Sequence, residues 1–222
     1  MSVITISRQR GCGGTEISRR LCELLGYTFF DKSLMVQVAA DVGMSDRDAI
    51  DFSEDNYKVK GFLTRLFSRG PRPAPEFMTT NTMPESGSML TVAQLDESRS
   101  IFFIRRTILA AYERSNVVIL GRGGQAVLKD MPDVLHVRLV APEGTRVRRI
   151  QARENISFSQ AYQMMVDRDQ ASVQFLDEFF GLRADDPALY HLMINTGKIE
   201  LEAAAQIIVA TVHEMQSEPV HA

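Results

Sequence analysis

The residues best suited to chemistry stand close together near the start of the chain, in the stretch ITISRQRGCGGTEIS from Ile4 to Ser18. A strand-like run here breaks into glycines and continues as a helical pattern. Glycines let backbone amides converge on an anion, and the positive end of the following helix points at the same place. We therefore predict a phosphate-binding turn, with a strand-to-helix turn that holds no ligand as the alternative. The residues of the predicted turn are Gly11, Cys12, Gly13, Gly14 and Thr15, with the Thr15 hydroxyl placed to hold Mg²⁺.

The turn departs at two positions from the pattern G-x-x-x-x-G-K-[ST], which commonly holds nucleotide phosphates. Arg8 stands in place of the first glycine, and Gly14 stands in place of the lysine that neutralises the β- and γ-phosphates. Loss of one such donor typically costs about 3 kcal/mol of transition-state stabilisation unless another cation replaces it. Arg8, Arg10 and Arg122 are the candidates for that replacement.

Composition limits the class of protein. The chain has 222 residues, of which 45% are hydrophobic and 24% charged, as is ordinary for one globular domain. Its 25 basic residues face 28 acidic ones, and this balance argues against nucleic acid as a partner. No window approaches the roughly eighteen apolar residues of a membrane span, and no targeting signal is visible at the N-terminus. We expect a cytoplasmic protein without a membrane partner, and the sequence leaves its oligomeric state open.

Neither the cysteines nor the histidines suggest a metal site. Cys12 and Cys22 are the only cysteines, and we expect both to be reduced thiols. Cys12 lies near a predicted helix N-terminus, where a thiolate would be stabilised, so redox sensing is an alternative role for it. The four histidines are too scattered along the chain to act together.

Strand-like runs alternate with helical patterns along the chain. Several runs are rich in β-branched or apolar residues, as parallel strands covered on both faces require. We therefore predict an α/β fold with a doubly wound parallel sheet of five strands and helices on both faces. The predicted strands are Val3–Ser7, Thr28–Asp31, Asn116–Gly121, Val134–Ala141 and His191–Thr196.

The segments between these strands predict a single domain with one long insertion. The first helix has a clear apolar stripe and ends at Gly26. Ser68–Met89 is rich in proline and is predicted to be a mobile loop or lid, followed by a helix over Thr91–Ser115. The predicted parts are a domain over 1–216, its helical and mobile insertion over about 32–115, and a tail over 217–222.

Four stretches carry a resemblance to a known family: ISRQRGCGGTEISRRLCELLGYTFFDKSLM, VVILGRGGQAVL, VLHVRLVAPEGTRVRRI and DDPALYHLMINT. In their order and spacing they resemble the cytidylate kinase-like family, and the likeness runs from Val3 to about Ile208. The resemblance implies a P-loop NTPase-like fold. It also implies transfer of the γ-phosphoryl group of ATP·Mg²⁺ to a nucleoside monophosphate, usually CMP or dCMP.

The resemblance implies roles for residues near the acceptor. Arg122 in GRGG matches the arginine that grips the monophosphate, and the alternative is a surface arginine that braces a loop. Gly123 stands where cytidylate kinases usually carry an aspartate that helps to bind cytidine. Asp31 matches the acidic residue that opens the monophosphate-binding segment, and it could equally cap a helix beginning at Lys32.

The resemblance also places a lid over about 154–182, where relatives carry several arginines that close over the transferring group. Arg168 and Asp169 remain, as candidates for catalysis and substrate binding, whereas Ser172 and Gln174 occupy places where arginine is expected. One or two arginines of the preceding RVRRIQAR segment could face the phosphates. Most of them are expected to be solvated or paired with glutamates.

At the end of the last predicted strand, Asn195 and Thr196 match the segment beside the adenine of ATP. Asn195 could instead satisfy backbone groups there. Two functions are therefore predicted: a nucleoside monophosphate kinase, or a nucleotide-binding or regulatory module of the same fold that has lost efficient transfer. A purely structural protein would leave the glycines and arginines of the turn unexplained.

Overall fold

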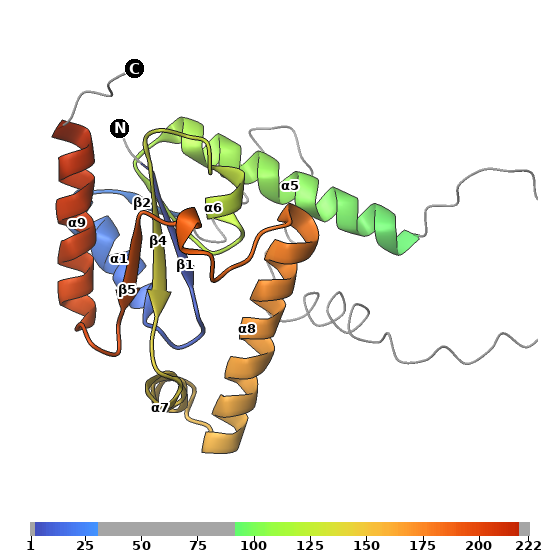
Figure 1. Cartoon of the computed structure of the whole chain (residues 1–222), viewed down its shortest axis with the longest axis vertical. Helices are drawn as coiled ribbons and strands as arrows, with labels where there is room; N and C mark the ends of the chain where they lie inside the picture. Colours follow the sequence, from blue (N-terminus) through green and yellow to red (C-terminus); the bar gives the residue numbers. More distant parts are fainter. Residues whose placement is uncertain (1–2, 31–91, 218–222) are drawn as a thin grey trace, which may run out of the picture.

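The structure is a computed structural model that describes residues 3–30 and 92–217, with side chains described from 101 onward in the second part (Figure 1). The five strands are all parallel and run in the order β2-β3-β1-β4-β5. This arrangement confirms the predicted doubly wound parallel sheet of an α/β fold. The strands are β1 (Val3–Arg8), β2 (Thr28–Phe30), β3 (Val117–Leu120), β4 (Val134–Val140) and β5 (Leu192–Asn195).

Helices cover both faces of the sheet (Figure 1). On one face, α1 and α9 pack together against Ile4 and Ile6 of β1. On the other, Phe103 and Ile108 of α5 pack against the first residue of β1, Val3. The helices are α1 (Gly14–Leu25), α5 (Val92–Arg114), α6 (Gly124–Val127), α7 (Glu143–Glu154), α8 (Phe158–Phe180) and α9 (Leu201–Ser217), with a 3-10 turn at Pro187–Leu189.

Helix α8 begins and ends at clear local signals. Ser157 forms a capping box with Gln160, and Gly181 ends the helix in the left-handed conformation. The segment predicted as a lid therefore contains one continuous helix. Most of α8 lies away from the sheet, and it packs beside α7 through Ala161 and Met165 (Figure 1).

Several predictions concern residues outside the described part of the chain. They include the role of Asp31, the loop Ser68–Met89 and nearly all of the tail. Within the described part, α1 ends at Gly26 as predicted, with φ 68°. No helix in 3–30 or 92–217 is both long and apolar enough to cross a membrane.

A polar contact lies inside the otherwise apolar sheet. The hydroxyl of Thr5 on β1 is 2.6 Å from Nδ1 of His136 on β4, and His136 is only 4% exposed. The His136 ring stacks on that of His191. Burial, reinforced by the neighbouring His191, lowers the pKa of His136 to about 4. The folded protein therefore keeps this imidazole neutral.

We predict that His136 makes the protein sensitive to acid. Its pKa falls from 6.5 to about 4 on folding, so the unfolded chain binds the proton more readily and stability falls as pH decreases through this window. The free energy of unfolding should fall by about 3 kcal/mol more in the native protein than in His136→Gln between about pH 7 and about pH 4. Urea unfolding across pH measures this. His213→Gln, at an exposed position, is the control that should behave like the native protein; equal pH profiles for the native protein and His136→Gln would contradict the prediction.

Candidate functional site

The glycine turn joins the end of β1 to the start of α1, and its backbone requires glycine. Gly11 and Gly13 have φ of 88° and 79°, in the left-handed region that side chains disfavour. A Cβ atom at Gly11 would lie 2.6 Å from the carbonyl oxygen of Arg146, and one at Gly13 would lie 2.5 Å from Leu201. Gly13 is the N-cap of α1 and supplies no side-chain cap. The first N–H groups of α1 therefore have no side-chain acceptor at the residue that usually caps them.

Two contacts hold the turn in place. On one side, the buried hydroxyl of Thr196 donates to the carbonyl of Cys12 at 2.9 Å, and Arg149 donates to both the hydroxyl and the carbonyl of Thr196. On the other side, a carboxylate oxygen of Asp169 accepts from the backbone N–H of Arg10 at 2.7 Å. The turn is thereby fixed from β5 and from α8 at once.

Asp169 is also ion-paired with Arg146, whose side chain is only 9% exposed. Arg146 donates in addition to the carbonyls of Ala141 and Arg10. Asp169 and Arg146 therefore hold the turn in this structure. Substrate binding by Asp169 stays a prediction.

The side chain of Arg8 runs from the end of β1 between two glycines. A Cβ atom at Gly14 would lie 3.3 Å from both Cγ and Cδ of Arg8, so the arginine stem occupies the space that a side chain at position 14 would enter. A Cβ atom at Gly121 would overlap Nη1 of Arg8. The guanidinium consequently reaches the carboxyl end of β3, where the GRGG sequence follows.

Arg122 has an unusual backbone. Gly121, Arg122 and Gly123 have φ of 72°, 58° and 73°, three successive residues in the left-handed region. For a residue with a side chain this conformation costs about 1–2 kcal/mol, and the flanking glycines allow it. The Arg122 guanidinium lies 5.8 Å from the ring centre of Phe30. Arg8 and Arg122 thus reach the same edge of the sheet, at the carboxyl end of β3.

Aromatic side chains of α8 close the position next to Arg122. A Cβ atom at Gly123 would lie 3.0 Å from Phe180 and 3.2 Å from Phe175. An apolar wall therefore stands where cytidylate kinases usually carry an aspartate. Arg105 of α5 lies over the ring of Phe180, with its Cζ 5.3 Å from the ring centre.

The structure corrects the alternative role predicted for Cys12. Its side chain is 1% exposed, and burial raises the pKa of the thiol to about 11. Arg146 lowers the pKa less than burial raises it. The prediction that the helix N-terminus stabilises a Cys12 thiolate is wrong, because Cys12 packs into the core with α1 and α9. Its place in the turn is as predicted.

The remaining predicted residues lie around this site. Asn195 accepts from the backbone N–H of Gly197 at 3.0 Å, in agreement with the alternative of a strand-end role, and its contact with a nucleotide stays a prediction. Arg168 is half-buried on α8, and its carbonyl accepts from the hydroxyl of Ser172. Thr15 is half-buried in the first turn of α1.

The donor set around Thr15 fits Mg²⁺ held largely by a bound nucleotide. Across the described residues, no group of three or more His, Cys, Asp or Glu side chains could hold a metal ion by itself. Mg²⁺ in phosphate-transfer sites usually has one or two protein ligands, with substrate phosphates and waters completing its shell. One hydroxyl at the start of α1 is compatible with that arrangement.

Sequence reasoning missed Arg138 on β4. The strand Val134–Val140 is buried, and Arg138 in its middle is 8% exposed, with Nη1 donating to the hydroxyl of Ser7 at 2.6 Å. The signal was available, because an arginine inside an apolar run of a two-sided parallel strand needs a polar partner.

Comparison with known proteins supports the resemblance. The model of the cytidylate kinase-like family matches residues 3–198. The chain belongs to this family. Among curated members, it is 25% identical to the cytidylate kinase of Thermococcus sibiricus over 96% of this chain and 89% of that protein. It is 28% identical to the cytidylate kinase of Sulfurisphaera tokodaii over 55% of this chain.

Coverage of the relatives is uneven. The matches to the cytidylate kinases of Sulfurisphaera tokodaii and Staphylothermus marinus span 64% and 65% of those proteins, just under two thirds. Among solved structures, an uncharacterized protein from Eubacterium ventriosum superposes with a TM-score of 0.63 at 20% identity, covering 96% of this chain and 98% of that chain. This likeness shows that the two proteins share a fold.

The wall beside Gly123 yields a prediction for this family member. Gly123→Asp should destabilise the fold, because the new side chain meets both a positive φ and two phenylalanine rings. Gly181→Asp is the matched control, since Gly181 has φ of 61° and nothing within 4 Å of its Cβ position. We expect a loss of about 1 kcal/mol at Gly181 and about 1–3 kcal/mol more at Gly123. Urea unfolding measures both losses of stability, and equal losses for the two variants would contradict the crowding predicted at Gly123.

Proposed function

We propose that this protein is an ATP-dependent nucleoside monophosphate kinase with a CMP- or dCMP-like acceptor. The ATP phosphates bind the N–H groups of the glycine turn, and Mg²⁺ is held at Thr15. Family membership supports phosphoryl transfer, and the relatives named as cytidylate kinases support the acceptor class. The observation that carries the proposal is the course of Arg8 across Gly14 to Gly121.

The two departures from the phosphate-binding pattern compensate each other in this proposal. The pattern places glycine at position 8 and lysine at position 14, whereas this chain has arginine and glycine. Because Gly14 lacks a side chain, the Arg8 stem passes within 3.3 Å of its Cβ position. The guanidinium then supplies the positive charge that the lysine would have supplied, entering from β1 instead of α1. Arginine also presents two parallel donors to a phosphate, which lysine does not.

The chemistry asked of the residues is positioning and charge neutralisation. An oxygen of the acceptor phosphate bonds to the γ-phosphorus of ATP, and the bond from that phosphorus to the β,γ-bridging oxygen breaks, releasing ADP. Arg8 neutralises charge on the transferring group. Arg122, held by its left-handed backbone at the end of β3, grips the acceptor phosphate.

A nucleotide-binding module with weak transfer is the second candidate. Helix α8 contains a single arginine, Arg168, and the neighbouring positions 172 and 174 carry serine and glutamine. Arg146 and Arg149 of α7 are engaged with Asp169 and Thr196 and hold the turn. Few arginines are thus placed to shield the transferring group, which favours slow turnover.

ADP formation distinguishes the two candidates. With ATP, Mg²⁺ and each nucleoside monophosphate in turn, we expect ADP formation that depends on Mg²⁺ and is stimulated most by CMP or dCMP. A coupled assay for ADP measures it. If the folded protein binds ATP and no monophosphate stimulates ADP release, the binding module is the function instead.

The exchange between positions 8 and 14 is testable by paired substitutions. Arg8→Met keeps the packing stem and removes the charge, so kcat should fall by about a hundred- to a thousand-fold. Gly14→Lys alone should lower activity, because its side chain meets the Arg8 stem. The double variant Arg8→Gly with Gly14→Lys should be more active than either Arg8→Met or Gly14→Lys alone. Steady-state kinetics measure all three, and an active Arg8→Met variant would rule out Arg8 as the replacement cation.

A further inference from the structure

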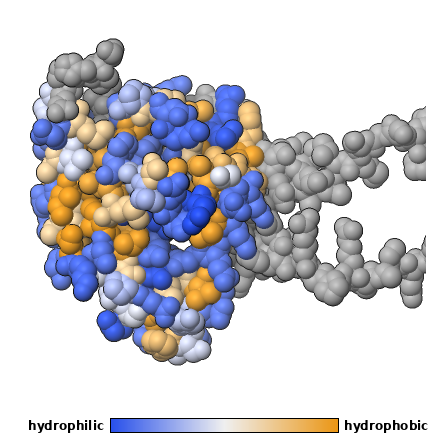
Figure 2. All heavy atoms as spheres, viewed as in Figure 1, coloured by the Kyte–Doolittle hydropathy of each residue, from blue (hydrophilic) through white to orange (hydrophobic). Residues whose placement is uncertain are grey.

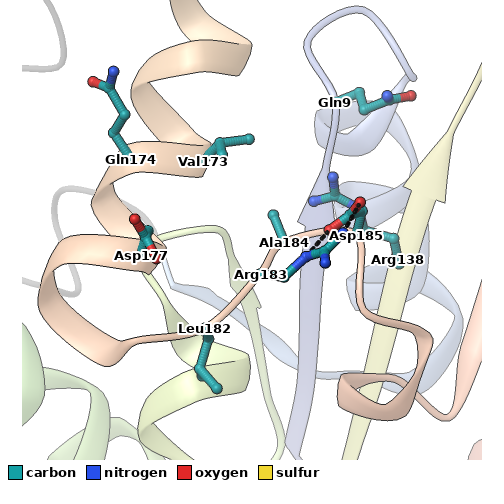
Figure 3. Close-up of a pocket in the computed structure, with 9 residues that line it drawn as sticks. All are labelled: Gln9, Arg138, Val173, Gln174, Asp177, Leu182, Arg183, Ala184 and Asp185. Carbon is teal, nitrogen blue, oxygen red and sulfur yellow. Dashed lines mark hydrogen bonds and ion pairs between the residues drawn. The ribbon is translucent and has the colours of Figure 1, made fainter.

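A cavity of about 490 Å³ lies between α8 and the carboxyl ends of the strands (Figure 3). Val173 and Asp177 line it from α8, Gln9 from the turn that follows β1, and Arg138 from β4. The Arg183–Asp185 segment crosses between them (Figure 3). Figure 2 shows the surface hollowed near the middle of the described part, with both hydrophilic and hydrophobic residues around the hollow. The volume is in the range of small-molecule sites. We call this space the Arg138 cavity.

Arg138 is the charge at the inner end of the cavity. Its side chain is 8% exposed, so the cation has lost most of its water. The groups it contacts directly are neutral: Nη1 donates to the Ser7 hydroxyl, and the guanidinium lies 5.9 Å from the ring centre of Tyr190. The Asp185 carboxylate also interacts with it electrostatically, without a direct ion pair. Among the described residues, no carboxylate lies within 4.0 Å of it, and its buried Nε has no hydrogen-bond partner. Arginine does not lose its proton in proteins, so it cannot escape the cost of burial by becoming neutral.

The geometry of the guanidinium says what would satisfy it. Nη1 is used by Ser7 and Nε is covered by protein atoms, so Nη2 is the nitrogen left for a ligand. A charged N–H donor matches an oxygen of a carboxylate or phosphate group. The inner end of the cavity is therefore complementary to one anionic group.

The outer rim has a different character. Arg183 and Asp185 neutralise each other, with Nη2 and Oδ2 3.1 Å apart and both side chains largely exposed. Their hydrogen bonds hold the pKa of Asp185 below its usual value. Asp177, exposed on α8, adds one further carboxylate. The rim thus offers oxygen acceptors, which favour hydroxyl or amino groups and disfavour a second anionic group.

We propose that the Arg138 cavity binds a small molecule that presents one phosphate or carboxylate group to Arg138 and hydroxyl or amino groups to the rim. This site is separate from the glycine turn and Arg122. Arg138 is on β4, which lies on the opposite side of β1 from β3, and it is in register with Ser7 of β1. A second space of about 60 Å³, lined by Arg8, Gln9 and Arg138, lies next to it. The ligand therefore sits beside the glycine turn without occupying it.

Calorimetric titration of the full chain without nucleotide tests the site. Ribose 5-phosphate and gluconate carry one phosphate and one carboxylate, each with hydroxyl groups, and ribose is the neutral probe. We expect one of the anionic probes to bind with one-to-one stoichiometry, which also identifies the preferred anion, and ribose not to bind. Absence of binding by both anionic probes up to about 10 mM would overturn the proposal.

Two variants remove binding in different ways. Arg138→Met removes the cation and should weaken binding at least tenfold. Val173→Trp fills the cavity from α8, and since Val173 is 49% exposed, the fold should be retained and binding lost. Arg148→Met is the matched control, because Arg148 is exposed on α7 and does not line the cavity. Undiminished binding in a folded Arg138→Met or Val173→Trp variant would overturn the proposal.

The readout is independent of the proposed kinase activity. Probe binding without ADP formation would support this inference and count against the kinase. ADP formation without probe binding would support the kinase and count against this inference.

Discussion

The carboxylate of Asp169 is the contact on which the arrangement of the site depends. One oxygen accepts from the backbone of the glycine turn, and the other is paired with Arg146 of α7, while Asp169 itself belongs to α8. Hydrogen bonds to charged groups typically contribute about 1.5–3 kcal/mol each. Three segments that are far apart in sequence are thereby fixed relative to one another. The wall of the Arg138 cavity and the approach of α8 to Gly123 both follow from this placement.

The proposed function keeps a positive charge at the site although the residues are changed. A glycine replaces the expected lysine, and the side chain of Arg8 from the preceding strand occupies the space that the glycine leaves. At Gly123 the expected acidic group is absent and no charged group replaces it. Phenylalanine side chains fill the space beside this glycine. Gly14 leaves space for the charged side chain of Arg8, and Gly123 leaves space for the phenylalanine side chains of α8.

The sequence predicted the five strands, their parallel direction and the glycine turn, because these depend on local patterns of apolar residues and glycines. It did not predict the burial of Cys12, since the core cluster that contains Cys12 includes α9, nearly two hundred residues further on. It treated Asp169 as a ligand residue, and its two bonds to the turn and α7 depend on how α8 folds back. Arg138 was missed because β4 was analysed as an apolar run, in which one charged residue was overlooked.

Helix α8 contains its own start and stop signals, with a capping box at Ser157 and left-handed residues at Asn155 and Gly181 on either side. Such a helix behaves as a rod, since neither end depends on distant residues to remain helical. Turning it about its axis at Asp169 would carry Val173 and Phe180 with it. A movement of α8 would therefore change the glycine turn, the Arg138 cavity and the phenylalanine wall at Gly123 together.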